Sequence, residues 1–213
     1  MAENDSDIRE SYDRVADKYA DAFYHELDHK PFDRDLLDRF AALVGPGASV
    51  LDVGCGPGHI GCYLADHGLV ASGLDLSPAM VARAKELNPA MTFTQGSMLA
   101  LPFSDGSFAA IVAFYSIIHL ARAEAPRALA EFFRVLQPGG YLLLAFHGGQ
   151  GEVHRDEWFG APVKVHATFF EPEEMAGWLR AAGFTVLETL ERPPYEEEYQ
   201  SRRVYLLAQR TTN

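Results

Sequence analysis

Hydrophobic and polar positions repeat along this chain with two different periods, and the change of period separates helices from strands. Residues 7–22 carry apolar side chains at steps of three and four, which is typical of one face of an amphipathic helix. A second helix is expected from Pro31, because proline is tolerated at a first helical position, and Gly45-Pro46-Gly47 ends it. These two helices predict an N-terminal helical cap over residues 1–44.

From residue 49 short apolar runs alternate with helical patterns. The pattern predicts strands at 49–53, 71–74, 91–95, 108–114 and 141–146, and helices at 60–67, 78–87 and 126–136. Ser77 is expected to cap the second of these helices, with Pro78 at its first position. Strand and helix in regular alternation favour a parallel sheet covered by helices on both faces, an α/β three-layer sandwich of Rossmann-like type. The run 108–114 is apolar throughout, so we expect it near the centre of the sheet.

The alternation of predicted strands and helices stops after Phe146. Residues 147–170 read as an irregular segment rich in His and Gly, and a loop of that length in a compact domain is often a lid or a binding loop. A helix at 173–182 and two strands at 184–190 and 204–209 complete the pattern. The link between those strands is short, so we expect them to pair antiparallel. The whole chain, 1–213, is predicted to be a single domain.

Composition narrows the choice of partners. A formal net charge of −12 repels phosphate backbones and anionic lipid, so neither nucleic acid nor a membrane is expected as a partner. Two cysteines give no disulfide framework and no zinc site. The polar, acidic start is unlike a signal peptide, and no apolar run has the ~18 residues that a membrane span needs. A cytoplasmic protein, as a monomer or homodimer, is expected.

The stretch Val50–Gly61, VLDVGCGPGHIG, carries the strongest signal for a binding site. A strand runs into a glycine turn and then into a helix, so the backbone can approach a ligand closely and the helix start offers unpaired N–H groups. Asp52, Asp75 and the segments after Gln95 and Phe114 all fall at carboxyl ends of predicted strands. Those ends meet at one edge of a parallel sheet, where ligands bind.

Taken together, these motifs resemble those of the class I S-adenosylmethionine-dependent methyltransferases, in particular the small single-domain type acting on small molecules. Four segments carry the resemblance, and they span nearly the whole chain: VLDVGCGPG at 50–58, GLDLS at 73–77, LPFSDGSFAAIV at 101–112 and LQPGGYL at 136–142. The resemblance implies a seven-stranded sheet in which only the strand 204–209 is antiparallel. It also implies S-adenosyl-L-methionine as cofactor, S-adenosyl-L-homocysteine as product and no metal ion.

The resemblance also implies where the cofactor lies. Asp75 would accept the ribose hydroxyls, the turn 54–58 would meet the amino acid part, and Asp52 would orient its ammonium group. The family commonly has an acid after the glycine near the adenine, whereas this chain has Ser97, whose hydroxyl can still accept a hydrogen bond. The full set of expected cofactor residues is Tyr12, Tyr19, Asp52, Gly54, Cys55, Gly56, Gly58, Asp75, Leu76, Met80, Gly96, Ser97, Met98, Phe114 and Tyr115. Core packing is the alternative for the two N-terminal tyrosines.

The acceptor half of the site is less specified. His119 and His147 follow the fourth and fifth predicted strands, and an imidazole with its ordinary pKa can act as a base at neutral pH. A structural histidine is the alternative for each. Tyr115, Trp158 and Arg203 complete the candidate substrate residues, with a hydrophobic plug as the alternative for Trp158 and a solvated side chain for Arg203.

Two rival functions remain open from the sequence. Gly56–Gly61 also satisfies the G-x-G-x-x-G pattern of NAD(P)-binding oxidoreductases, although that match alone is weak. A non-catalytic S-adenosylmethionine-binding protein is the second rival. The favoured prediction is methyl transfer to a small-molecule acceptor by in-line displacement.

Overall fold

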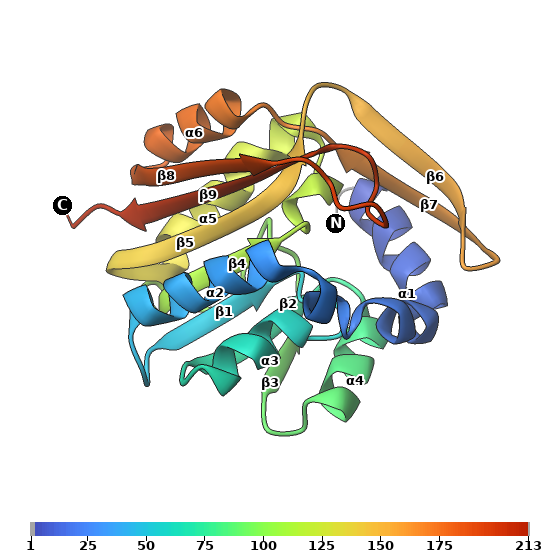
Figure 1. The fold of residues 1–213 in the computed structure, drawn as a ribbon, viewed down its shortest axis with the longest axis horizontal. Helices are drawn as coiled ribbons and strands as arrows, with labels where there is room; N and C mark the ends of the chain where they lie inside the picture. The colour runs from blue at the N-terminus through green and yellow to red at the C-terminus, as the bar shows by residue number, and fades with distance from the viewer. Residues whose placement is uncertain (1–2, 213) are drawn as a thin grey trace.

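A computed structural model describes residues 3–212, in which a seven-stranded sheet lies between two layers of helices (Figure 1). The strands of the sheet are β1 (Ser49–Val53), β2 (Val70–Asp75), β3 (Thr92–Gln95), β4 (Phe108–Phe114), β5 (Leu136–Gly148), β8 (Phe184–Arg192) and β9 (Arg202–Arg210). The helices are α1 (Glu3–Phe23), α2 (Pro31–Val44), α3 (His59–Asp66), α4 (Pro78–Leu87), α5 (Ala125–Val135) and α6 (Pro172–Ala181). Three short 3-10 turns are η1 (Glu26–His29), η2 (Ile117–His119) and η3 (Arg122–Glu124). The predicted α/β fold class is confirmed.

The strand order is β3-β2-β1-β4-β5-β9-β8. Strands β1 to β5 pair in parallel, and β9 pairs antiparallel with both β5 and β8. The prediction that only the last strand is antiparallel is therefore confirmed. The order reverses direction between β1 and β4, and that switch point is where a crevice opens at the carboxyl ends of such strands.

Each face of the sheet is buried against helices. Alternate residues of the central strands point to opposite faces, so Ile111 belongs to the core under α5 and α6, whereas Val112 packs towards α2 and α3. Both side chains are fully buried, which confirms the central place expected for β4. Among the described helices, none has the length and apolar character needed to cross a lipid bilayer.

The expectation of an irregular loop over 147–170 is wrong. This segment forms a separate antiparallel hairpin of β6 (Glu152–Trp158) and β7 (Ala161–Thr168). The pattern was hard to recognise because β6 is exposed at five of its seven positions and shows no apolar alternation. Only β7 alternates, and its Val163 and Val165 are buried against α1. Tertiary packing on a helix, rather than the strand's own composition, stabilises this hairpin.

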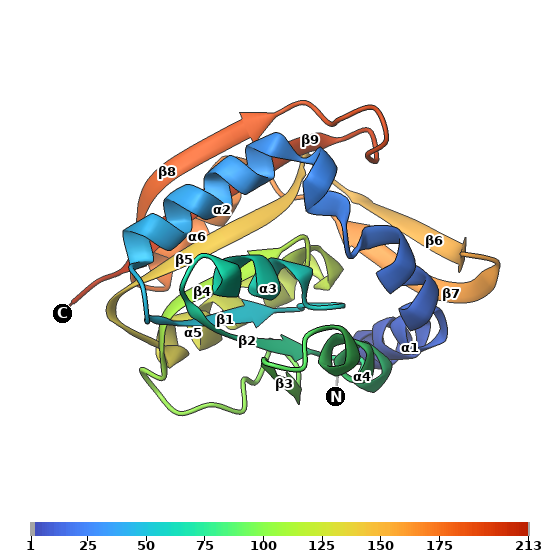
Figure 2. The ribbon, with the colours of Figure 1, turned by 60° about the horizontal axis from the view of Figure 1, so that its bottom comes forward.

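Helix α1 and the hairpin lie side by side beyond the carboxyl ends of β1, β2 and β4 (Figures 1 and 2). The helix begins at Glu3, four residues before the predicted start, and the extra turn brings Asp5 into the fold, where it is buried. The hairpin and α1 together close the edge of the sheet at which the candidate site residues meet.

Candidate active site

The glycine turn after β1 is shaped by close packing. Gly54 has φ +69°, and a Cβ at this position would lie 2.3 Å from the Cβ of Ser116, so no other residue fits. The N–H groups of Gly54 and Cys55 both donate to the carbonyl of Leu74, which ties the turn to the end of β2. This arrangement leaves the backbone of Gly54 and Gly56 facing a cavity.

Two carboxyl groups lie beside the turn, Asp52 buried and Asp75 half-buried. Asp75 Oδ2 accepts from the N–H of Gly56 at 2.8 Å, and Oδ1 accepts from the N–H of Ser77 at 2.9 Å. Burial raises the pKa of Asp75 to about 6, although both N–H groups act in the opposite direction. Asp52 accepts from the N–H of Gly61 at 3.0 Å, and burial raises its pKa to about 7. Each carboxylate retains lone pairs for a ligand.

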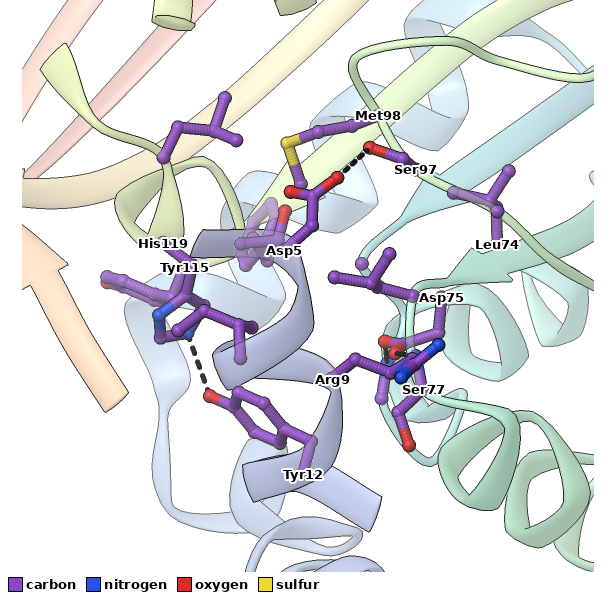
Figure 3. A pocket seen from close by; sticks show the side chains of 18 of the residues that line it. Asp5, Arg9, Tyr12, Leu74, Asp75, Ser77, Ser97, Met98, Tyr115 and His119 are labelled. Atoms are coloured by element: carbon purple, nitrogen blue, oxygen red, sulfur yellow. Dashed lines mark hydrogen bonds between the residues drawn. The ribbon is translucent and has the colours of Figure 1, made fainter. Parts of the chain in front are cut away.

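A narrow inner cavity of about 90 Å³ runs between α1 and the ends of β1 to β4 (Figure 3). Most of the predicted cofactor residues line it. They are Tyr12, Tyr19, Gly54, Gly56, Asp75, Leu76, Gly96, Ser97, Met98, Phe114 and Tyr115, together with the base candidate His119. The structure thus brings together residues that are separated by more than a hundred positions in the sequence.

A much larger outer cavity, of about 1260 Å³, adjoins the inner one. Tyr12, Tyr19, Gly54, Gly56, Phe114, Tyr115 and His119 line both cavities. The remaining predicted residues Asp52, Cys55, His147, Trp158 and Arg203 line the outer one. Trp158, at the tip of the hairpin, packs edge-on against Tyr19 with ring centroids 5.2 Å apart, and forms part of the wall.

Two predicted residues line neither cavity. Met80 is fully buried on the core side of α4, where Ser77 caps the helix by accepting from the N–H of Met80 at 3.0 Å. Gly58 has φ +84°, and a Cβ there would lie 2.9 Å from the amide of Asn88 and the ring of Phe93. Gly58 is therefore required for the turn into α3, and its expected contact with the cofactor is not supported.

His119 is held by two hydrogen bonds. Its Nδ1 lies 2.7 Å from the backbone carbonyl of His166, which only accepts, so Nδ1 carries the proton. Nε2 then accepts from the hydroxyl of Tyr12, also at 2.7 Å. Burial lowers the pKa of His119 to about 4. The imidazole is neutral at pH 7, with its one basic nitrogen directed at the point where the two cavities meet.

His147 lies in a different environment. An N–H of Arg203 is 2.5 Å from Nδ1 of His147, and the hydroxyl of Ser201 is 2.7 Å from the same atom. Burial and then the charge of Arg203 lower the pKa of His147 to about 3. Arg203 is itself buried and pairs with Glu198 at 3.3 Å, so it is not the solvated side chain that was the alternative.

Several lining residues were not predicted. The inner cavity also contacts Asp5, Ile8, Arg9, Leu74, Ser77, Ser116 and Leu120, and the outer one contacts Phe23, Glu26, Lys30, Phe169, Tyr195 and Glu198 among others. A signal for the α1 residues was present, because Asp5, Ile8, Arg9 and Tyr12 follow steps of three and four. No signal in the sequence indicated the remote loop 193–201.

Comparison with known proteins gives the family. A family model described as a methyltransferase domain matches residues 50–140. A protein of Synechocystis sp., described as an uncharacterized methyltransferase, is 33% identical over 154 residues, which cover 68% of this chain and 70% of that protein. The chain belongs to the class I S-adenosylmethionine-dependent methyltransferases. S-adenosylmethionine is accordingly its cofactor, and an NAD(P)-dependent oxidoreductase is not favoured.

Further relatives of this methyltransferase match over shorter lengths. A demethylmenaquinone methyltransferase of Beutenbergia cavernae is 38% identical over 112 residues, or 53% of this chain and 45% of that protein. A malonyl-[acyl-carrier protein] O-methyltransferase of Serratia marcescens is 29% identical over 142 residues, or 65% of this chain and 55% of that protein. The methyltransferase thus spans about half the length of these two curated relatives.

Solved structures agree on the fold. Magnesium protoporphyrin IX methyltransferase from Synechocystis, crystallised with bound S-adenosylmethionine, superposes with a TM-score of 0.73 at 19% identity, covering 99% of both chains. A methyltransferase from Methanosarcina mazei gives 0.72 at 20% identity, covering 79% of this chain and 95% of that one. At such identities the likeness concerns the fold alone.

Proposed function

We propose that this methyltransferase methylates a small, flat and largely apolar acceptor bound in the outer cavity under Trp158. The observation that carries the proposal is the junction of the two cavities at Tyr115 and His119, which gives a cofactor and an acceptor one shared boundary. The outer cavity exceeds the roughly 300–1,000 Å³ of ordinary ligand sites. It is walled by aromatic residues such as Phe23 and Phe169, which suit a flat substrate. A relative named as a demethylmenaquinone methyltransferase agrees with such a substrate.

The residues present fit S-adenosylmethionine. The Asp75 carboxylate is fixed by two backbone N–H groups and keeps lone pairs for the two ribose hydroxyls. The Gly54–Gly56 backbone and the Asp52 carboxyl form an acceptor-rich end for an ammonium group. Glu26 also lines the outer cavity, where its carboxylate pairs with Lys30 at 2.7 Å and His59 at 2.9 Å, and these partners lower its pKa to about 2 against the effect of burial. Leu76 and Met98 offer apolar contacts for a purine ring.

When bound, S-adenosylmethionine supplies a methyl group already activated on a sulfonium centre. The residues of this chain then have three tasks: to orient, to exclude water and to accept a proton where the acceptor loses one. Tyr12, Tyr19 and Trp158 exclude water, because their rings pack together over the junction. Lower water activity favours a reaction in which positive charge is dispersed.

We assign the proton-accepting role to His119 in preference to His147. The Nε2 lone pair of His119 is directed at the junction and is occupied by the Tyr12 hydroxyl, which an acceptor hydroxyl can displace. The Nδ1 lone pair of His147 is occupied by the permanent charge of Arg203 instead. With a pKa of about 4 His119 is a weak base, so positioning is expected to supply most of the rate enhancement.

The remaining features of the proposal concern the whole chain. Of the cap predicted over 1–44, residues 3–44 serve as a helical cap, and residues 147–170 serve as a lid on one methyltransferase domain; residues 1 and 2 lie outside the described part of the chain. Neither nucleic acid nor membrane is a partner, in line with the net charge of −12. The protein acts as a monomer or homodimer in the cytoplasm, a compartment in which its two free cysteines stay reduced.

A thermal-shift experiment tests the proposal. S-adenosylhomocysteine at 100 times its Kd adds about 2.7 kcal/mol to the free energy of unfolding, which raises Tm by about 5–10 °C for a chain of this size. NAD at the same concentration is expected to leave Tm unchanged. In the Asp75→Ala variant the shift with S-adenosylhomocysteine should largely disappear. Stabilisation by NAD alone would overturn the proposal.

A further inference from the structure

A buried acid from the first turn of α1 reaches the inner cavity. Asp5 is 7% exposed, and its Oδ2 lies 3.3 Å from the hydroxyl of Ser97 (Figure 3). Both residues line the cavity, next to Gly96 and Met98 and across from Asp75. A buried carboxylate is costly unless charged or polar groups compensate it.

The hydrogen-bonding capacity around Asp5 is not used up. A carboxylate only accepts, so the Ser97 hydroxyl must donate its proton to Asp5. That hydroxyl also receives the N–H of Leu99 at 3.2 Å, which leaves one lone pair. Among the described residues, Asp5 has Ser97 as its hydrogen-bond partner, through Oδ2. The Oδ1 atom of Asp5 retains its acceptor capacity. Asp5 and Ser97 therefore present acceptors, and no proton, to a ligand.

We propose that Asp5 binds the exocyclic amino group of the adenine ring and makes the site selective for a 6-aminopurine. The inference rests on the proposed placement of the cofactor, with its ribose on Asp75. Leu74, Leu76 and Met98 line the same cavity as apolar walls for a flat ring, and Ile8 adds one from the side of α1. An amino group donates two hydrogen bonds, which match the free lone pairs of Asp5 and Ser97.

The inference explains an exception in the sequence. The resemblance leads one to expect an acid directly after Gly96, where this chain has Ser97. The structure brings a carboxylate to the same place from 92 positions earlier in the sequence, on a different element. Helix α1 thereby becomes part of the adenine site as well as a cover over it. Bound nucleoside and α1 must stabilise each other, since each supplies the other's hydrogen-bond partner.

Isothermal titration of two nucleosides against three variants tests the inference. S-adenosylhomocysteine carries the amino group, and S-inosylhomocysteine carries a carbonyl oxygen in its place, which a carboxylate repels. We expect the wild-type protein to bind the adenosyl compound about 100-fold more tightly. A hydrogen bond to a charged group is strong, and a buried charged group left without a partner is costly. Asp5→Asn should lower the affinity for the adenosyl compound about 10- to 100-fold. It should bind the inosyl compound more tightly than the wild type does, since the amide can donate a hydrogen bond to the carbonyl. Asp5→Ala should reduce the preference without that gain.

Asp17→Asn is the matched control, because Asp17 lies on the same helix with its side chain 89% exposed. It should bind both compounds as the wild type does. Equal weakening of both compounds by the Asp5 variants would indicate a purely structural acid and overturn the inference, as would unchanged affinity in both variants. If the wild-type protein bound neither compound, the placement of the cofactor itself would be wrong, and the role of Asp5 with it.

Discussion

Asp52 and Asp75 show at the scale of single residues how a binding site is prepared. Each carboxyl group lies at the end of a strand, Asp52 buried and Asp75 half-buried, and their pKa values are raised to about 7 and about 6 respectively. Near neutral pH they are partly protonated in the free protein. An ammonium group beside Asp52, or ribose hydroxyls on Asp75, would favour the ionised forms, so cofactor binding must release protons.

The first prediction concerns this proton release. Because the bound state requires the carboxylates, the affinity for S-adenosylhomocysteine should rise as the pH increases from about 5 to about 8 and then level off. In the Asp52→Asn variant the increase in affinity near pH 7 should be absent. The increase near pH 6, which is due to ionisation of Asp75, should remain. The neighbouring His59 lowers the pKa of Asp52 and stays in place in this variant. Calorimetry in buffers of different ionisation enthalpy measures the protons released; identical profiles for variant and wild type would contradict the prediction.

The second residue-scale prediction separates the two histidines. His119→Ala should lower kcat by about 10²-fold or more for an acceptor that loses a proton, whereas His147→Ala should stay within about tenfold of wild type. Tyr12→Phe is the informative companion, because it removes the hydroxyl from Nε2 of His119 but keeps the ring. It should retain more activity than His119→Ala. Full activity in both histidine variants would mean that positioning alone suffices.

At the scale of elements, α1 connects two parts of the site that are otherwise separate. Its Asp13 carboxylate accepts from the Ser77 hydroxyl at 2.5 Å and from the N–H of Ala79 at 3.2 Å, which attaches it to the start of α4. On the other side, its Ser11 hydroxyl accepts from the N–H of Lys164 at 2.8 Å in β7. The helix and the hairpin, which lie together at one side of the molecule (Figure 2), therefore form one cover, and both contribute residues to the outer cavity.

The third prediction follows from this connection. If α1 and the hairpin open together, S-adenosylhomocysteine should slow amide hydrogen exchange in residues 8–20 and in residues 152–168 by a similar factor, about tenfold or more. Strand β8, at the far edge of the sheet, serves as the internal control and should not change. Ser11→Ala should weaken the protection of the hairpin more than that of α1. Protection confined to one of the two segments would show that they move independently.

Element by element, the sequence was most informative where one local rule applied. Ser77 before Pro78 predicted the start of α4, and the structure shows that cap. The hairpin was missed because β6 is exposed at five of its seven positions and β7 is buried through α1 and the segment around η2. A strand whose burial depends on a remote helix carries little signal of its own.

At the scale of the whole molecule, a buried chain of polar groups connects the site with the helical cap. The Tyr115 and Tyr205 hydroxyls are 2.9 Å apart, and Tyr205 donates to Asp33 of α2 at 2.7 Å. Arg192 of β8 pairs with the same carboxyl at 2.9 Å. Since Tyr205 donates to Asp33, Tyr115 must donate to Tyr205, which fixes the orientation of a residue at the junction of the cavities. Nothing in the local sequence around these four residues indicates that they meet.

The sequence by itself determined the positions and the direction of the strands of the main sheet, the glycine turn, the cofactor family and the acids at the strand ends. These depend on local periodicity and on the rule that carboxyl ends of parallel strands share an edge. The tertiary structure alone decided that Gly58 and Met80 lie outside the cavities, that His147 is paired with Arg203, and that Asp5 reaches Ser97. The physical reason is that contacts between distant segments depend on how elements pack, and spacing within a segment does not encode that packing.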